Sequence, residues 1–161
     1  MAGDGGSRER GNPIGPTART VGENVSRFRS QLGFTQADLS RRLSENGRPI
    51  PVASIGRIES GDRRVDVDDL MALSVALAVT PVALLLPATR SPQDRVELSG
   101  WGEVSAGWAW GYALGTRDLV DVVFTGDDGR ARWDLPLAAR SFPLWAEEEV
   151  RRFYGLDQAE G

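Results

Sequence analysis

The sequence predicts a mainly α protein, with five short helices over residues 19–87 followed by a small α+β segment over residues 99–157. Two changes in composition separate these parts. All five Trp, both Tyr and three of the five Phe lie after residue 100. Residues 17–87 carry nine Arg against eight acidic residues, whereas residues 88–161 carry eight Arg against thirteen acidic residues. We therefore expect two separate modules.

The starts of the first two helices are marked by residues that cap helices. Thr20 and Glu23 have the spacing of a capping box, which predicts the start of the first helix. The apolar side chains that follow recur on one helical face: Val21, Val25, Phe28 and Leu32. Thr35 and Asp38 repeat the capping-box spacing and predict the second helix. Two leucines of this helix are expected to face the core: Leu39 and Leu43.

Two further helices follow a polar turn over residues 44–49. Pro51 predicts the start of the third helix, because the first N–H groups of a helix have no partner within it. Gly61 predicts its end, and its expected core residues are Ile55 and Ile58. Asp66, with Asp69 three positions later, predicts the start of the fourth helix. The leucines of the fourth helix that we expect to be buried are Leu70, Leu73 and Leu77.

The first module is expected to end with a fifth helix over residues 80–86, with an arm before the module and a linker after it. Residues 88–98, which include Pro92, predict a linker. Residues 1–18 are rich in glycine and predict a flexible arm.

Residues 99–157 predict a helix, a β-hairpin and a second helix. Ser105 has the position of a cap for a short helix over residues 105–114. Two strand-like runs joined by a Gly-Asp-Asp-Gly turn predict a hairpin over residues 119–137. Residues 144–154 predict a closing helix. Most of the Trp side chains are expected to lie in the core of this small segment.

The residue types that are missing from the chain exclude several kinds of chemistry. The sequence has no Cys, His or Lys, and all 19 basic residues are Arg. Disulfides, thiolate or imidazole metal sites, Ser–His–Asp triads and Schiff bases all need one of these residues. We therefore expect neither an enzyme nor a metal or other cofactor. No apolar run is long enough to predict a signal peptide or a membrane anchor, and we expect a cytoplasmic protein.

Three motifs of the first module occur in an order and at spacings that are typical of one protein family. They are Thr35-Gln36-Ala37-Asp38-Leu39, Ser54-Ile55-Gly56-Arg57-Ile58-Glu59-Ser60-Gly61 and Val67-Asp68-Asp69-Leu70-Met71-Ala72-Leu73. Over roughly residues 20–86 the chain resembles the Cro/repressor (XRE) family of helix-turn-helix regulators. The resemblance implies a lambda-repressor-like five-helix domain that binds DNA. A Trp-containing segment after such a domain, with Arg as the only basic residue, resembles regulators of actinobacteria and their phages.

The resemblance also implies which residues contact DNA. The helix over about residues 51–60 would enter the major groove. Arg57 would form a bidentate pair with guanine, worth roughly 1–3 kcal/mol of discrimination, while Val52 and Ala53 would read shape or a thymine methyl group. Gln36 would hold a phosphate through its side-chain amide. The full set of expected contact residues is Thr35, Gln36, Val52, Ala53, Ser54, Arg57, Ser60, Arg63 and Arg64. The last three of these follow the helix, where the family contacts the DNA backbone.

Other interpretations of these arginines stay open. Arg57 is also a candidate structural partner of Glu59 or of an acidic residue in the fourth helix, and we expect Glu59 to secure the following turn. Arg63 and Arg64 are also consistent with an ordinary solvated turn. Arg48 lies in the polar turn, which is about five residues longer than the family needs. There it either contacts a phosphate or keeps the loop soluble.

Two functions are compatible with the sequence. The first is a sequence-specific regulator, most simply a repressor, that binds a double-stranded DNA operator as a homodimer or a monomer. Residues 99–157 would then serve assembly or regulation. The second is a protein-interaction module, antitoxin-like or a co-regulator, whose acidic Trp-rich segment binds a protein partner. Residues 1–18 either reach a minor groove, with Arg8, Arg10 and Arg19 as the contacts, or form a leader without function.

Overall fold

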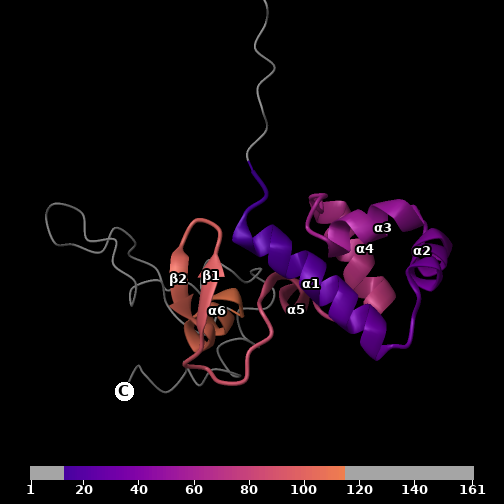
Figure 1. The fold of residues 1–161 in the computed structure, drawn as a ribbon. Coiled ribbons are helices and arrows are strands. Elements are labelled where there is room, and N and C mark those ends of the chain that lie inside the picture. Colours follow the sequence, from indigo (N-terminus) through magenta and orange to yellow (C-terminus); the bar gives the residue numbers. More distant parts are fainter. Residues whose placement is uncertain (1–12, 115–161) are drawn as a thin grey trace, which may run out of the picture. The chain divides into compact units, whose positions relative to one another are not determined.

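The computed structural model describes residues 13–114 and contains six helices and two strands within this range (Figure 1). They are α1 (Pro16–Gln31), α2 (Gln36–Glu45), α3 (Val52–Glu59), α4 (Val67–Leu77), α5 (Pro81–Leu85), β1 (Arg95–Leu98), β2 (Gly102–Ser105) and α6 (Ala106–Ala113). The chain divides into two compact units, Met1–Leu85 with α1 to α5 and Leu86–Gly161 with β1, β2 and α6. The predicted mainly α fold is confirmed. None of the helices within residues 13–114 has the length and apolar character needed to cross a membrane.

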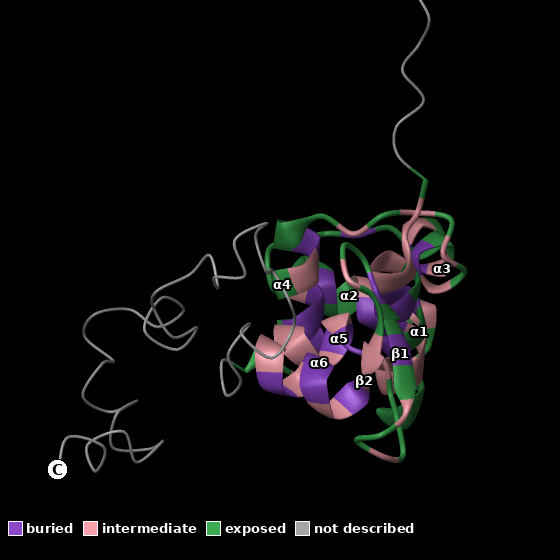
Figure 2. Ribbon diagram, turned by 90° about the vertical axis from the view of Figure 1, so that its left-hand side faces the viewer, coloured by how far each residue is buried: buried purple, intermediate pink, exposed green. Residues whose placement is uncertain are grey.

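The core of the first unit is built from one face of each of its five helices, shown in purple in Figure 2. Its buried members are Val21, Val25, Leu39, Leu43, Ile50, Ile55, Ile58, Leu73, Ala76, Leu77 and Leu84. The predicted core residues of α2 and α3 are all buried, as are two of the three leucines of α4, while Leu70 packs against the core and is half-buried. The helices are between 5 and 16 residues long. Most of their stability therefore comes from this shared packing.

Helix α1 begins earlier than the sequence predicted. Gly15 is its N-cap and Pro16 its first residue, so the capping box predicted at Thr20 and Glu23 is wrong. A proline suits the first helical position, since it has no N–H and its φ angle is already helical. Thr20 lies inside α1 and is 7% exposed. At the other end, Leu32 is the C-cap and is 43% exposed, so it does not extend the buried stripe.

The other predicted helix starts of this unit are confirmed. The Thr35 hydroxyl accepts a hydrogen bond from the N–H of Asp38, whose carboxylate accepts one from the N–H of Thr35, so the capping box is complete. Pro51 is the N-cap of α3. The Asp66 carboxylate accepts the N–H of Asp69 at 2.7 Å and caps α4.

The described part of the second unit is an antiparallel β-hairpin followed by a helix. Ser105 caps α6 as predicted. The hairpin of β1 and β2 was not predicted, and β1 lies within residues 88–98, which were expected to be a linker. The hairpin expected over 119–137 and the helix expected over 144–154 lie outside the described residues.

Three aromatic side chains pack together in the second unit. The rings of Trp101 and Trp108 have centroids 4.8 Å apart, and Tyr112 stacks on Trp108 at 5.3 Å. Trp108 is 7% exposed. For this residue the structure supports the expected place in the core.

Candidate nucleic-acid interface

The loop between α2 and α3 leaves α2 through a Schellman motif. Gly47 follows the C-cap with a φ angle of 81°, which a residue without a Cβ adopts without strain. Its N–H donates to the carbonyl of Ser44 at 3.0 Å, and the N–H of Arg48 donates to the carbonyl of Leu43 at 2.9 Å. The first part of the loop therefore has a defined path.

The far end of the same loop is also held by α2. Ile50 is 2% exposed and belongs to the core. The hydroxyl of Ser40, in α2, donates to the carbonyl of Ile50 at 2.7 Å. As a result, α3 begins at a point that is fixed relative to α2.

Helix α3 has one buried face and one exposed face. Ile55 and Ile58 are buried in the core. The first turn presents Val52 and Ala53 to solvent, and Arg57 is exposed one turn later. Within residues 13–114 the Arg57 side chain makes no hydrogen bond or ion pair, so it is not the structural partner of Glu59 that was considered above. Helix α3 is therefore a short helix that presents one exposed cationic residue, Arg57.

Glu59, in the last turn of α3, joins three helices. Its carboxylate accepts hydrogen bonds from Arg29 of α1 at 2.6 and 3.0 Å and from the side-chain amide of Gln36 of α2 at 2.9 Å. The side chains of Arg29 and Glu59 are 15% and 9% exposed. The hydrogen bond to Glu59 is the main reason that the pKa of the Arg29 guanidinium lies above its ordinary value. Glu59 therefore holds α3 in place and leaves one amide N–H of Gln36 for another acceptor.

The residues after α3 differ in their surroundings. Ser60 is exposed, and its hydroxyl donates to the carboxylate of Asp62 at 2.6 Å. Arg64 is exposed, and its guanidinium donates to the carbonyl of Pro13 at 3.1 Å. Arg63 is half-buried and turns toward α4. Of the two arginines expected at the DNA backbone, Arg64 is therefore the more accessible.

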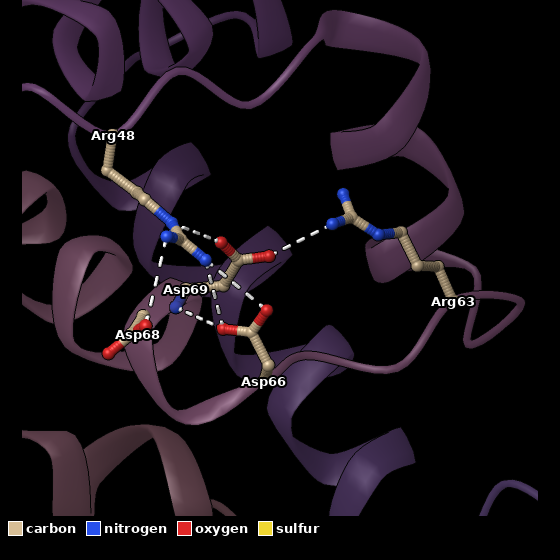
Figure 3. Close-up of polar contacts among 5 residues, drawn as sticks. All are labelled: Arg48, Arg63, Asp66, Asp68 and Asp69. Atoms are coloured by element: carbon tan, nitrogen blue, oxygen red, sulfur yellow. Dashed lines mark hydrogen bonds and ion pairs between the residues drawn. The ribbon is translucent and has the colours of Figure 1, made fainter.

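Arg48 and Arg63 share the carboxylate of Asp69, in the first turn of α4 (Figure 3). The Nε of Arg48 donates to Oδ1 at 2.9 Å, and the Nη2 of Arg63 donates to Oδ2 at 2.9 Å. The Asp69 side chain is 4% exposed. Hydrogen bonding to Asp69 is the main cause that raises the pKa of the Arg48 guanidinium. Neither interpretation considered for Arg48, a phosphate contact or a solubilising side chain, included this ion pair.

Two further carboxylates surround the Arg48 guanidinium. Its Nη2 lies 3.3 Å from the carboxylate of Asp66, and its Nη1 lies 3.8 Å from that of Asp68. The first turn of a helix favours such negative charges, because the N–H groups there have no partner within the helix. Sequence reasoning did not identify Asp69 as the partner of Arg48 and Arg63. Its capping position was recognised, but no local signal indicates that arginines from two separate loops reach it.

Among residues 13–114 no group of three or more acidic side chains is arranged to hold a metal ion. The arrangement instead provides a short exposed helix with the guanidinium of Arg57, a second exposed guanidinium at Arg64 and donors at the start of α2. Guanidinium groups and amides of this kind bind phosphates and base edges. Five packed helices with such a face define a helix-turn-helix DNA-binding domain as the class of fold and site.

Comparison with known families agrees with this class. Residues 25–84 match the family model described as helix-turn-helix, which supports the XRE type and a DNA-binding transcription regulator. No curated protein and no solved structure gives a significant match to the chain.

Proposed function

We propose that the chain is a sequence-specific transcriptional repressor that inserts α3 into the major groove of a double-stranded DNA operator. The observation that carries the proposal is the two-sided character of α3. Its inner face is anchored by buried isoleucines and by Glu59, while its outer face is open: Val52, Ala53 and Arg57. The major groove of B-DNA is about 12 Å wide and admits one such helix.

Arg57 is the residue to which we assign base recognition. Its exposed guanidinium has no side-chain partner among the described residues and is available for the O6 and N7 atoms of a guanine. Such a pair discriminates against other bases by roughly 1–3 kcal/mol. Val52 and Ala53 offer apolar surface that suits the methyl group of thymine.

The remaining predicted contact residues are assigned to the DNA backbone: Thr35, Gln36, Ser54, Ser60, Arg63 and Arg64. Backbone contacts fix the position of the protein on DNA and carry little sequence information. The exposure of Arg64 supports this role, and the second amide N–H of Gln36 suits a phosphate oxygen. For Arg63, which is paired with Asp69, the assignment requires a further N–H of the guanidinium.

A net charge of -4 does not oppose DNA binding by this domain, because the charge is unevenly distributed. Residues 17–87 carry one more Arg than acidic residues, and the excess of acidic residues lies in 88–161. Binding should weaken steeply with salt. The logarithm of the binding constant should fall with the logarithm of the salt concentration, with a slope of about -0.9 for each phosphate that the protein neutralises. The acidic excess of 88–161 opposes a second DNA surface there and supports a role in assembly or regulation.

Repression is the simplest outcome of such binding, because a protein on an operator blocks other proteins from the same DNA. The lack of Lys supports an origin in a GC-rich genome, such as that of an actinobacterium or its phage.

We also propose that two copies pair on the operator. An exposed apolar stripe on α4 supports such a contact: Val67, Met71 and Val75 are 76%, 54% and 62% exposed. The test compares the oligomeric state of the wild type, measured by sedimentation, with that of Met71→Glu, which places a charge in this stripe.

The experiment that tests the proposed function is selection of bound sequences from random duplexes by the full chain. The wild type should enrich one operator, palindromic if two copies pair. Arg57→Ala should weaken the preference at one base position, while Arg90→Ala, at an exposed position of the second unit, should leave it unchanged. An unchanged preference in Arg57→Ala would contradict the placement of α3. No enriched sequence at all would favour the second candidate, a module that binds a protein partner through residues 88–161.

A further inference from the structure

The two loops that flank α3 are attached to one buried carboxylate. Arg48 lies in the loop before α3, Arg63 lies in the loop after it, and each donates to a different oxygen of Asp69 at 2.9 Å. Figure 3 shows the two guanidinium groups on opposite sides of this carboxylate. Because the Asp69 side chain is only 4% exposed, water does not readily replace either arginine.

Helix α3 is short, and its polar contacts with α1 and α2 lie at Glu59, in its last turn. It spans eight residues and buries two side chains, Ile55 and Ile58. A helix of this length is not stable alone, and two buried side chains three positions apart on one face do not by themselves fix its tilt about the line that joins them. Glu59 holds the C-terminal turn against α1 and α2. The N-terminal turn, which faces the bases in the proposed complex, has no such ion pair within residues 13–114. It depends on the preceding loop, whose far end is held at Ile50 by the Ser40 hydroxyl.

We propose that Asp69 is a positioning residue that sets, through Arg48 and Arg63, the angle at which α3 meets DNA. The inference rests on the proposed function, because this angle matters only if α3 reads base edges. A bidentate contact to a base depends strongly on orientation, whereas contacts of long side chains to phosphates adapt to small rotations. The attachment therefore controls discrimination between DNA sequences more than affinity for DNA in general.

The test compares three variants of the full chain. Asp69→Asn keeps the size of the side chain and removes the charge that both arginines share. Arg48→Gln releases only the loop before α3. Asp68→Asn is the matched control, because this neighbouring carboxylate is 77% exposed and 3.8 Å from Arg48. Each variant is measured for folded fraction by circular dichroism and for affinity toward the selected operator and a scrambled duplex at one salt concentration.

Asp69→Asn and Arg48→Gln are expected to lower the ratio of the two affinities by about tenfold or more, the discrimination of one base contact. Asp68→Asn is expected to keep the ratio of the wild type. A network that only stabilises the fold would lower both affinities by the same factor, and an unchanged ratio in folded variants overturns the proposal. If Asp69→Asn does not fold, Arg48→Gln decides, because Arg63 still pairs with the carboxylate in that variant.

Amide hydrogen exchange without DNA separates this inference from the proposed function. In Asp69→Asn or Arg48→Gln, amides of residues 46–66 should exchange about tenfold faster relative to those of α1, while Asp68→Asn should match the wild type. If the wild type prefers no DNA sequence, the proposed function is refuted and exchange alone decides. Unchanged exchange then overturns the positioning of α3, and faster exchange supports it.

Discussion

Glu59 offers a quantitative test of how the helices of the first unit are held together. Its carboxylate accepts three hydrogen bonds, two from Arg29 and one from Gln36, at 2.6, 3.0 and 2.9 Å. The side chains of Arg29 and Glu59 are 15% and 9% exposed. A Glu59→Gln substitution keeps the shape of the side chain, removes its charge and turns one acceptor into a donor. The Arg29 charge would then remain largely out of water without its partner.

The expected loss of stability follows from this burial. Removing one partner of a buried ion pair typically costs about 3–5 kcal/mol, and we expect about 3 kcal/mol because both side chains keep some contact with water. For a domain of this size the melting temperature should fall by about 12–24 °C. Adding Arg29→Met removes the unpaired charge, so the double variant should recover part of the loss in the free energy of unfolding.

Thermal unfolding followed by far-ultraviolet circular dichroism measures this loss, since five of the six described helices belong to the first unit. All five Trp lie after residue 100, so Trp fluorescence of the same sample reports on the second unit. Glu45→Gln is the control, because Glu45 is 66% exposed and 4.0 Å from Arg41. It should change stability by less than about 0.5 kcal/mol. A loss below about 1 kcal/mol for Glu59→Gln, or no recovery in the double variant, would refute the reasoning.

Three further predictions concern the same unit. In Gly22→Ala the new Cβ would lie 2.2 Å from the carbonyl oxygen of Ile58, so α1 and α3 must separate and urea unfolding should show a loss of about 1–3 kcal/mol. An unchanged midpoint would contradict this close approach. Hydrogen bonds, first of all from the Thr35 hydroxyl, lower the pKa of Asp38 below its ordinary value of 3.8. The charged form therefore stabilises the fold above pH 3.8, and this contribution is lost as the pH falls through the lowered pKa. Melting temperatures of the wild type and Asp38→Asn should converge in acid, and a constant difference would contradict this. Arg57→Ala should leave the melting temperature almost unchanged, because the side chain is exposed and unpaired among residues 13–114. A clear drop would indicate a structural role.

Which helix starts could be predicted depends on how local their signals are. Thr35, Asp66 and Ser105 each accept a hydrogen bond from the backbone N–H three positions later. Donor and acceptor lie within one turn, so the sequence alone contains the whole interaction. The start of α1 was misplaced because Pro16 and Thr20 both carry a start signal. The helix begins at the earlier proline, so Thr20 lies inside α1 and not at its start.

Contacts between distant positions were beyond sequence reasoning. Arg48 and Asp69 are 21 positions apart, and Arg29 and Glu59 are 30 positions apart. Nine arginines and eight acidic residues in residues 17–87 allow many pairings, and only the paths of the loops select among them. For the same reason β1 was missed. A run of four residues has too little alternation to be distinguished from a linker until its partner strand supplies the hydrogen bonds.

The division of α3 into an anchored inner face and an open outer face has a consequence for engineering. Val52, Ala53 and Arg57 take no part in the core. Exchanging these three side chains should therefore change stability by about 0.5 kcal/mol or less at each position. If α3 reads DNA as we propose, replacing these surface residues should change the preferred DNA sequence and leave the core of the domain intact.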